Sequence, residues 1–175
     1  MTDFINLRVN ILRLVFGTAL WSTLAGCTGP LIYRPAKKTT PLIAPAAVTN
    51  SNLPPEPDIK SNNATLAGID TTGTGIRDDV YIWIYRNYTS AKKNKTITKM
   101  AKALQVVIVT PAKTTEDARK LKQSLDDALL LLKGVPGLGA NDADKLDLYL
   151  YDLTVNTPER LKSYLHYNLL LGDKK

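Results

Sequence analysis

From Leu66 onward, apolar residues recur with the 3.6-residue period of an α-helix. Pro111 and the turn sequence Gly134-Val135-Pro136-Gly137 divide this pattern into segments of helical length. Amphipathic segments joined by short connections bury their apolar faces by packing against one another. The pattern therefore predicts an all-α domain of four to five helices over residues 66–175.

Apolar spacing and end signals place the first three helices. Apolar faces at residues 80–88 and 97–108 predict two helices, the second ending before Pro111. Thr114 has the character of an N-cap for a third helix, which Gly134 is expected to end.

Two more helices are predicted toward the C-terminus. The segment Leu146–Leu153 has helical apolar spacing, although its first three leucines also alternate as in a strand. Thr157 followed by Pro158 is typical of a helix start, and Gly172 is expected to close this last helix.

Residues 27–65 have the composition of a linker. Seven prolines lie between Thr28 and Thr65, among many Thr, Asn and Ala residues and without a sustained apolar period. Such a segment buries too little apolar surface to order itself. As a flexible coil, this stretch would span about 35 Å, so it is expected to hold the helical domain at a distance from its attachment point.

The single cysteine of the chain closes the tetrapeptide Leu24-Ala25-Gly26-Cys27. The tetrapeptide ends an eleven-residue apolar run that begins at Leu14, and the run is preceded by Arg8 and Arg13. Positive charge, a short apolar run and small residues before a cleavage point are typical of a secretory signal. The arrangement resembles the signal sequence and lipobox of bacterial lipoproteins.

The resemblance implies a lipid anchor. Residues 1–26 would be a signal peptide cleaved between Gly26 and Cys27, and Cys27 would carry a diacylglyceryl thioether and an N-acyl chain such as palmitate. The protein would then face the periplasm from a membrane, with another envelope protein as its expected partner. Thr28 stands where an aspartate usually marks retention at the inner membrane, so the outer membrane is favoured.

A transmembrane helix and a buried core helix are two other interpretations of the N-terminal segment. Eleven apolar residues fall short of the roughly 20 that a transmembrane helix needs. A core cysteine at the end of an N-terminal helix is the remaining alternative to the signal sequence.

Charge and cysteine content limit the class of protein further. The chain has 23 basic and 16 acidic residues, a net charge of +7, and loss of the signal peptide would leave 21 and 15, a net charge of +6. A basic envelope protein suits anionic lipid head groups or polysaccharide, and nucleic acid is not an expected partner. No cysteine follows Cys27, so the domain has no internal disulfide and depends on its apolar core.

The densest basic run is Lys92-Lys93-Asn94-Lys95, continued by Lys99 and Lys102. A solvated turn and helix start is the favoured interpretation of this run, and a docking patch is the alternative.

Residues Asp70–Tyr81 resemble the calcium-binding loop of EF-hand proteins. The resemblance implies calcium ligands at Asp70, Thr72, Thr74, Ile76 (through its carbonyl) and Asp78, with Gly75 at the sharp turn. Tyr81 stands where the bidentate glutamate belongs, and hydroxyls replace two carboxylates, so the cage would be weak. The favoured alternative is a metal-free loop whose Asp78 and Asp79 complement the N-terminus of the following helix.

No catalytic set is expected. His166 is the single histidine, which leaves no zinc site and no Cys-His or Ser-His-Asp constellation. The carboxylate pairs, such as Asp126-Asp127, lie in polar stretches that suit solvated helix faces, although a carboxylate hydrolase was also weighed.

Aromatic residues crowd the segment 80–88, where Val80, Ile84 and Tyr88 are expected to face inward. Tyr81, Tyr85 and Arg86 then form a possible interaction surface, since exposed Tyr beside Arg is typical of one. The plainer alternative is that these rings cover a neighbouring helix.

Taken together, these patterns predict a lipid-anchored envelope protein that presents a small helical binding or accessory domain and is not an enzyme. A calcium-responsive envelope or adhesion module is the alternative.

Overall fold

The computed structural model describes residues 53–172. Within this range the chain forms six helices and no strand: α2 (Ile59–Asn62), α3 (Asp78–Asn87), α4 (Ala91–Val109), α5 (Thr115–Lys133), α6 (Ala140–Thr154) and α7 (Pro158–Gly172). The predicted all-α fold is therefore confirmed. The predicted signal peptide, Cys27 and the predicted linker up to residue 52 lie outside the described residues.

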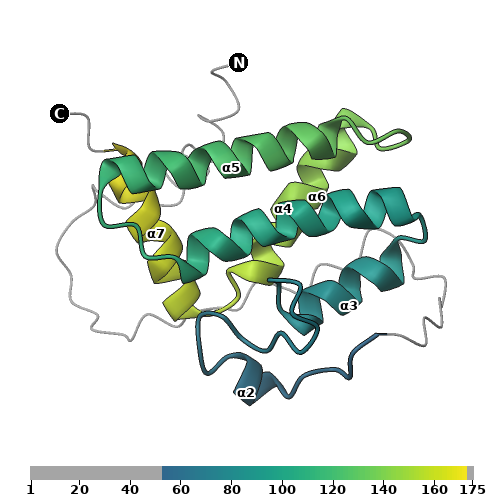
Figure 1. The fold of residues 1–175 in the computed structure, drawn as a ribbon, viewed down its shortest axis with the longest axis horizontal. Coiled ribbons are helices and arrows are strands. Elements are labelled where there is room, and N and C mark those ends of the chain that lie inside the picture. The colour runs from purple at the N-terminus through teal and green to yellow at the C-terminus, as the bar shows by residue number, and fades with distance from the viewer. Residues whose placement is uncertain (1–52, 173–175) are drawn as a thin grey trace, which may run out of the picture. The chain divides into compact units, whose positions relative to one another are not determined.

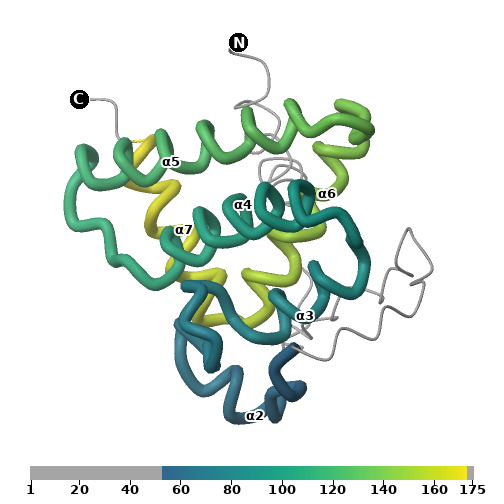
Figure 2. Tube along the Cα trace, turned by 45° about the vertical axis from the view of Figure 1, so that its right-hand side comes forward, coloured from purple at the N-terminus to yellow at the C-terminus, as the bar shows by residue number. Residues whose placement is uncertain are grey.

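Helix α4 lies at the centre of the packing and contacts α3, α5, α6 and α7. Figures 1 and 2 show α4 and α5 side by side, with α6 and α7 crossing them and α3 on the opposite side of α4 from α5. The apolar positions of α4 that predicted this helix all lie in the core and are at most 1% exposed: Ile97, Met100, Ala101, Leu104, Val107 and Ile108.

The predicted end signals of α5 and α7 act as caps. The Thr114 hydroxyl accepts from the Asp117 amide (3.1 Å), and the Asp117 carboxylate accepts from the Thr114 amide (3.0 Å). This reciprocal pair is a capping box, and Gly134 caps the other end of α5. The Thr157 hydroxyl accepts from the Arg160 amide (3.3 Å) at the start of α7.

The segment Leu146–Leu153, which also alternated like a strand, lies within α6. The buried face of α6 includes Ala143, Leu146 and Leu150. These residues recur every three or four positions, which is the spacing of a helix and not the alternation of a strand. On α3, Val80 and Ile84 are buried as predicted, and Ile82 is buried as well.

The domain begins before the predicted boundary at residue 66. Residues 58–65 include α2, and the backbone carbonyls of Asn62 and Thr65 accept hydrogen bonds from Arg160 at 2.6 and 2.9 Å. These residues, which composition assigned to the linker, are therefore bonded to helix α7 of the domain. Residues 58–65 have little apolar surface, so their composition gave no sign of a fixed structure. The buried guanidinium of Arg160 on α7 holds them by donating hydrogen bonds to their backbone carbonyls.

None of the helices between residues 53 and 172 is both long and apolar enough to cross a membrane.

Candidate functional site

The loop before α3, residues 70–77, is organised by Asp70. Its carboxylate accepts from the backbone N–H of Thr74 (3.1 Å) and Gly75 (2.8 Å) and from the Thr72 hydroxyl (3.1 Å). Gly73 and Gly75 have positive φ, 65° and 84°, which lets the backbone turn its amides toward that carboxylate. Three of the predicted calcium ligands, Asp70, Thr72 and Thr74, are therefore brought together.

The other two predicted ligands are the Asp78 side chain and the backbone carbonyl of Ile76. Asp78 is 1% exposed and accepts from both the backbone N–H (3.1 Å) and the hydroxyl (2.6 Å) of Thr71. Ile76 is 1% exposed, and its side chain lies in the core. Asp78 and Asp79 lie in the first turn of α3, where their charge complements the helix dipole as predicted.

A lysine from α4 lies against this loop. The Lys102 ammonium donates to the Thr74 carbonyl at 3.1 Å. Its positive charge opposes the binding of a second cation beside that carbonyl. Between residues 53 and 172, no group of three or more His, Cys, Asp or Glu side chains is arranged to hold a metal ion.

Tyr81 and Tyr85 form one face of α3. Their rings are stacked, with centroids 4.4 Å apart and planes 26° apart, and both side chains are half-buried. Burial, together with the neighbouring Tyr85 hydroxyl, raises the pKa of Tyr81 to about 12. Arg86 is exposed and forms an ion pair with Glu56. The predicted surface therefore combines a stacked pair of half-buried tyrosines with a cation that already has an exposed partner.

A second aromatic group joins α3 to α6. The Trp83 ring lies 4.5 Å from Tyr149 and 6.1 Å from Tyr88, measured between centroids. Burial raises the pKa of Tyr88, and the charge of Asp142 adds to that effect. These rings cover a neighbouring helix, which is the plainer of the two predicted uses of aromatic residues on α3.

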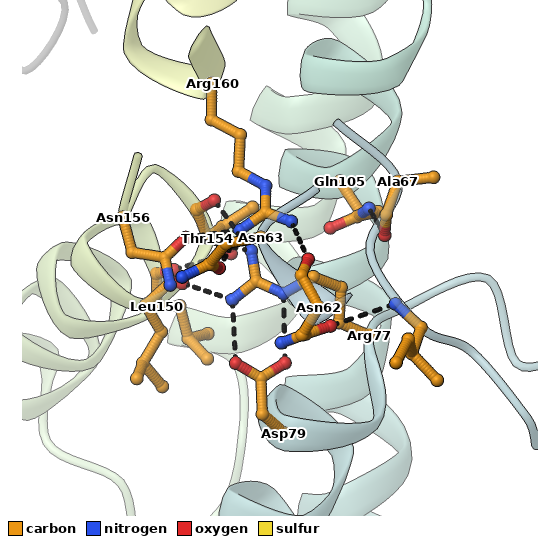
Figure 3. Close-up of polar contacts among 12 residues, drawn as sticks. Asn62, Asn63, Ala67, Arg77, Asp79, Gln105, Leu150, Thr154, Asn156 and Arg160 are labelled. Carbon is orange, nitrogen blue, oxygen red and sulfur yellow. Dashed lines mark hydrogen bonds and ion pairs between the residues drawn. The ribbon is translucent and has the colours of Figure 1, made fainter. Parts of the chain in front are cut away.

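The most densely connected polar cluster in the described range contains Arg77 and Arg160, which the sequence did not single out (Figure 3). Both residues are 0% exposed. Arg77 donates to both oxygens of Asp79 (2.9 Å each) and to the carbonyls of Leu153 (2.6 Å) and Thr154 (3.1 Å). It thereby joins the start of α3 to the end of α6.

Arg160 joins α7 to the N-terminal part of the domain. It donates to the carbonyls of Asn62 (2.6 Å), Thr65 (2.9 Å) and Leu66 (3.1 Å) and to the side chain of Asn63 (3.0 Å). These four contacts hold the chain between α2 and the loop before α3.

Positive charge exceeds negative charge in this cluster, because two guanidinium groups are accompanied by one carboxylate, Asp79, which contacts Arg77. Burial alone would raise the pKa of the Asp79 carboxyl, but hydrogen bonds and charge from Arg77, with a further bond from Asn62, hold it below its usual value. Burial, and next the charge of Arg77, lower the pKa of Arg160 to about 10, so it stays protonated at neutral pH.

The cluster has no donor left for a ligand. A guanidinium has five N–H donors, and every nitrogen of Arg77 and Arg160 already bonds to a protein oxygen, the Asn156 side chain included. Its role is structural. A weak signal existed in the sequence, because both arginines lie next to helix starts rich in Asp, Asn and Thr.

The remaining candidates for chemistry have ordinary partners. The His166 imidazole Nε2 lies 3.0 Å from the Ala112 carbonyl. Asp126 pairs with Lys122 on α5, and Asp127 accepts from Gln123. Between residues 53 and 172, no arrangement of a nucleophile, a base and an orienting acid is apparent from these contacts.

No protein-family model matches this chain, and neither the curated proteins nor the solved structures gave a match. The case for a function therefore rests on the residues themselves.

Proposed function

We propose that this chain is a lipid-anchored protein of the bacterial cell envelope whose helical domain is a binding or accessory module without catalytic machinery. The observation that carries the proposal is the lipobox-like tetrapeptide Leu24-Ala25-Gly26-Cys27 at the end of an apolar run. A thiol is required at this position because the anchor is a thioether to a diacylglyceryl group.

The strength of such an anchor supports the proposal. Each buried methylene contributes about 0.8 kcal/mol, so two or three acyl chains hold a protein far more firmly than one myristoyl group. A 19.2 kDa chain with one small helical domain needs no transmembrane helix if it is held in this way. Thr28 favours the outer membrane as the destination.

The polar groups of the domain support a non-enzymatic role. The buried charged side chains of Arg77, Asp78 and Arg160 bond to groups that fix the fold. The Tyr81 and Tyr85 pair, with Arg86 beside it, is the surface that we assign to an envelope partner.

The anchor is tested by the chemistry of Cys27. The full chain is expressed in a bacterium with its lipoprotein-processing machinery, and detergent-phase partitioning is followed by mass spectrometry of the mature N-terminus. We expect an acylated Cys27 at the N-terminus, and a Cys27→Ser variant that is neither acylated nor partitioned. A wild-type protein with a free thiol and residues 1–26 still attached would overturn the proposal.

A matched variant tests the destination separately. Thr28→Asp leaves Cys27 in place, so acylation should persist while the protein shifts from the outer to the inner membrane fraction. If both proteins fractionate together, outer-membrane sorting is wrong although the anchor stands.

The partner surface is tested by cross-linking in cells. We expect Arg86→Glu to reduce the yield of one dominant cross-linked envelope protein, while Arg119→Glu, an equal charge change at an exposed residue of α5, leaves it unchanged. Equal yields from the two variants would remove Arg86 from the proposed surface.

A further inference from the structure

Four lysines form a row along the exposed face of α4: Lys92, Lys95, Lys99 and Lys102. Their spacing of three, four and three residues keeps them on one side of a helix. At 1.5 Å per residue the row is about 15 Å long. We call these four residues the lysine row.

The positive charge of the lysine row is not balanced by neighbouring acids. Helix α4 carries five lysines and no acidic residue. Among residues 53–172, no carboxylate lies within ion-pair distance of the row, whereas lysines elsewhere do pair, as Lys122 with Asp126, Lys133 with Asp144 and Lys145 with Asp142.

The first residue of the row, Lys92, is also placed where it disfavours its own helix. The N-terminus of a helix carries a partial positive charge, which acidic residues stabilise and lysines destabilise. Helices α3 and α5 have two acids each in the first turn, but α4 has none there and begins Ala91-Lys92-Lys93. An anionic surface against this face would relieve both the repulsion among the lysines and the repulsion from the dipole.

We propose that the lysine row docks onto the anionic phospholipid head groups of the membrane to which the chain is anchored. The inference rests on the proposed lipid anchor. A row of exposed lysines, of which Lys102 also donates to the Thr74 carbonyl, fits a surface of phosphates, each lysine contributing to the attraction within a Debye length of that surface.

If the domain is anchored through Cys27, a weak contact between the lysine row and the membrane is enough for docking, because the segment that joins them is short. The 25 residues between Cys27 and Leu53 would span about 28 Å if they form the flexible coil that their composition predicts. An anchored domain within that distance is at an effective concentration of the order of millimolar at the surface. Four lysines near an anionic leaflet are then enough to populate a docked state that salt releases.

Lysine footprinting on the full anchored chain tests the proposal. The protein is reconstituted into vesicles of phosphatidylcholine alone or with phosphatidylglycerol added, and the rate at which an amine-reactive reagent modifies each lysine is measured by mass spectrometry. Lys60, Lys113, Lys120 and Lys162, which are exposed and lie outside α4, serve as controls within the same molecule.

We expect the lysine row to be modified at least about threefold more slowly on anionic vesicles, with the controls unchanged. At about 0.5 M salt, where the Debye length is about 4 Å, the protection should disappear. Equal rates for row and control lysines on both vesicles would overturn the proposal. So would protection by soluble acidic polypeptide without protection by anionic vesicles, because it would identify a protein as the partner.

A charge-matched pair of variants gives a second measurement. A variant with all four row lysines changed to Gln should lose the preference for anionic vesicles, and one with the four control lysines changed to Gln should keep it. If both behave alike, net charge rather than the row is responsible and the proposal fails. Failure of the lipid anchor is distinguished by a different result, because a chain without the anchor would not stay bound to vesicles of either composition at high salt.

Discussion

Arg77 and Arg160 donate to the same atom, the side-chain oxygen Oδ1 of Asn156, at 3.2 and 2.6 Å. One guanidinium stands before α3 and the other in the first turn of α7, so this oxygen joins two segments that are far apart in the sequence (Figure 3). The two guanidinium groups carry like charges and repel each other. The Asn156 oxygen that they share and the Asp79 carboxylate offset that repulsion.

Arg160→Lys should destabilise the domain by about 3 kcal/mol or more, because a lysine ammonium cannot reach all the carbonyls that a planar guanidinium satisfies and buried acceptors are left unpaired. Urea unfolding measures the loss, and hydrogen exchange should show it first in residues 58–68. Arg119→Lys, at an exposed position of α5, is the matched control and should change the unfolding free energy by less than about 0.5 kcal/mol. A small effect at Arg160 would show that solvent can replace these contacts.

Gly68→Ala and Gly73→Ala separate backbone strain from packing. Both glycines have positive φ, 68° and 65°, so both substitutions carry the left-handed penalty of about 1 kcal/mol. A Cβ at Gly68 would lie 2.3 Å from Cδ of Arg77, whereas a Cβ at Gly73 would meet nothing within 4 Å. We expect Gly68→Ala to cost at least about 2 kcal/mol more in the free energy of unfolding. Equal costs would show that Arg77 can move aside.

Asp79 should contribute to acid sensitivity. Because the pKa of its carboxyl is lower in the folded than in the unfolded protein, its stabilisation is present above the ordinary value of 3.8 and is lost as the pH falls through the folded value. Asp79→Asn should therefore flatten the fall of the unfolding free energy below about pH 4. Urea unfolding at a series of acidic pH values measures the slope, and an unchanged slope would contradict the role given to Arg77.

Tyr81 should ionise late in an alkaline titration, near pH 12. The Tyr85→Phe variant keeps the ring stack but removes the neighbouring hydroxyl, so the pKa of Tyr81 should fall while burial still holds it above 10. Ultraviolet absorbance of the tyrosinate follows the titration. Tyr149→Phe is the control, since its ring contacts Trp83 rather than Tyr81.

Lys92→Glu should stabilise the domain by about 0.5 kcal/mol at low salt, because it replaces a positive by a negative charge in the first turn of α4. Lys99→Glu makes the same change at an exposed position in the middle of α4, far from the helix end, and should give no such gain. Thermal unfolding at low and high salt compares the two. A loss of stability in Lys92→Glu would show that the charge is balanced by a group not among the described contacts.

The period of the apolar residues determined the helical class, since each segment can bury its apolar face only by packing on another helix. The chain pattern also placed several helix ends, because Thr114, Thr157 and Gly134 act through hydrogen bonds within a few residues of themselves. These interactions are local, so the order of residues is enough to predict them.

The tertiary structure alone decided the arginine cluster and the early start of the domain. Arg160 meets its carbonyl partners more than ninety residues away in the sequence, and no short-range pattern encodes such a contact. The same holds for Lys102 at the loop before α3, which neither helical periodicity nor the resemblance to a calcium loop predicted. Local interactions determined the helices. Two buried guanidinium groups need oxygen partners, and the hydrogen bonds that they form in the folded chain determine how the ends of the domain are held.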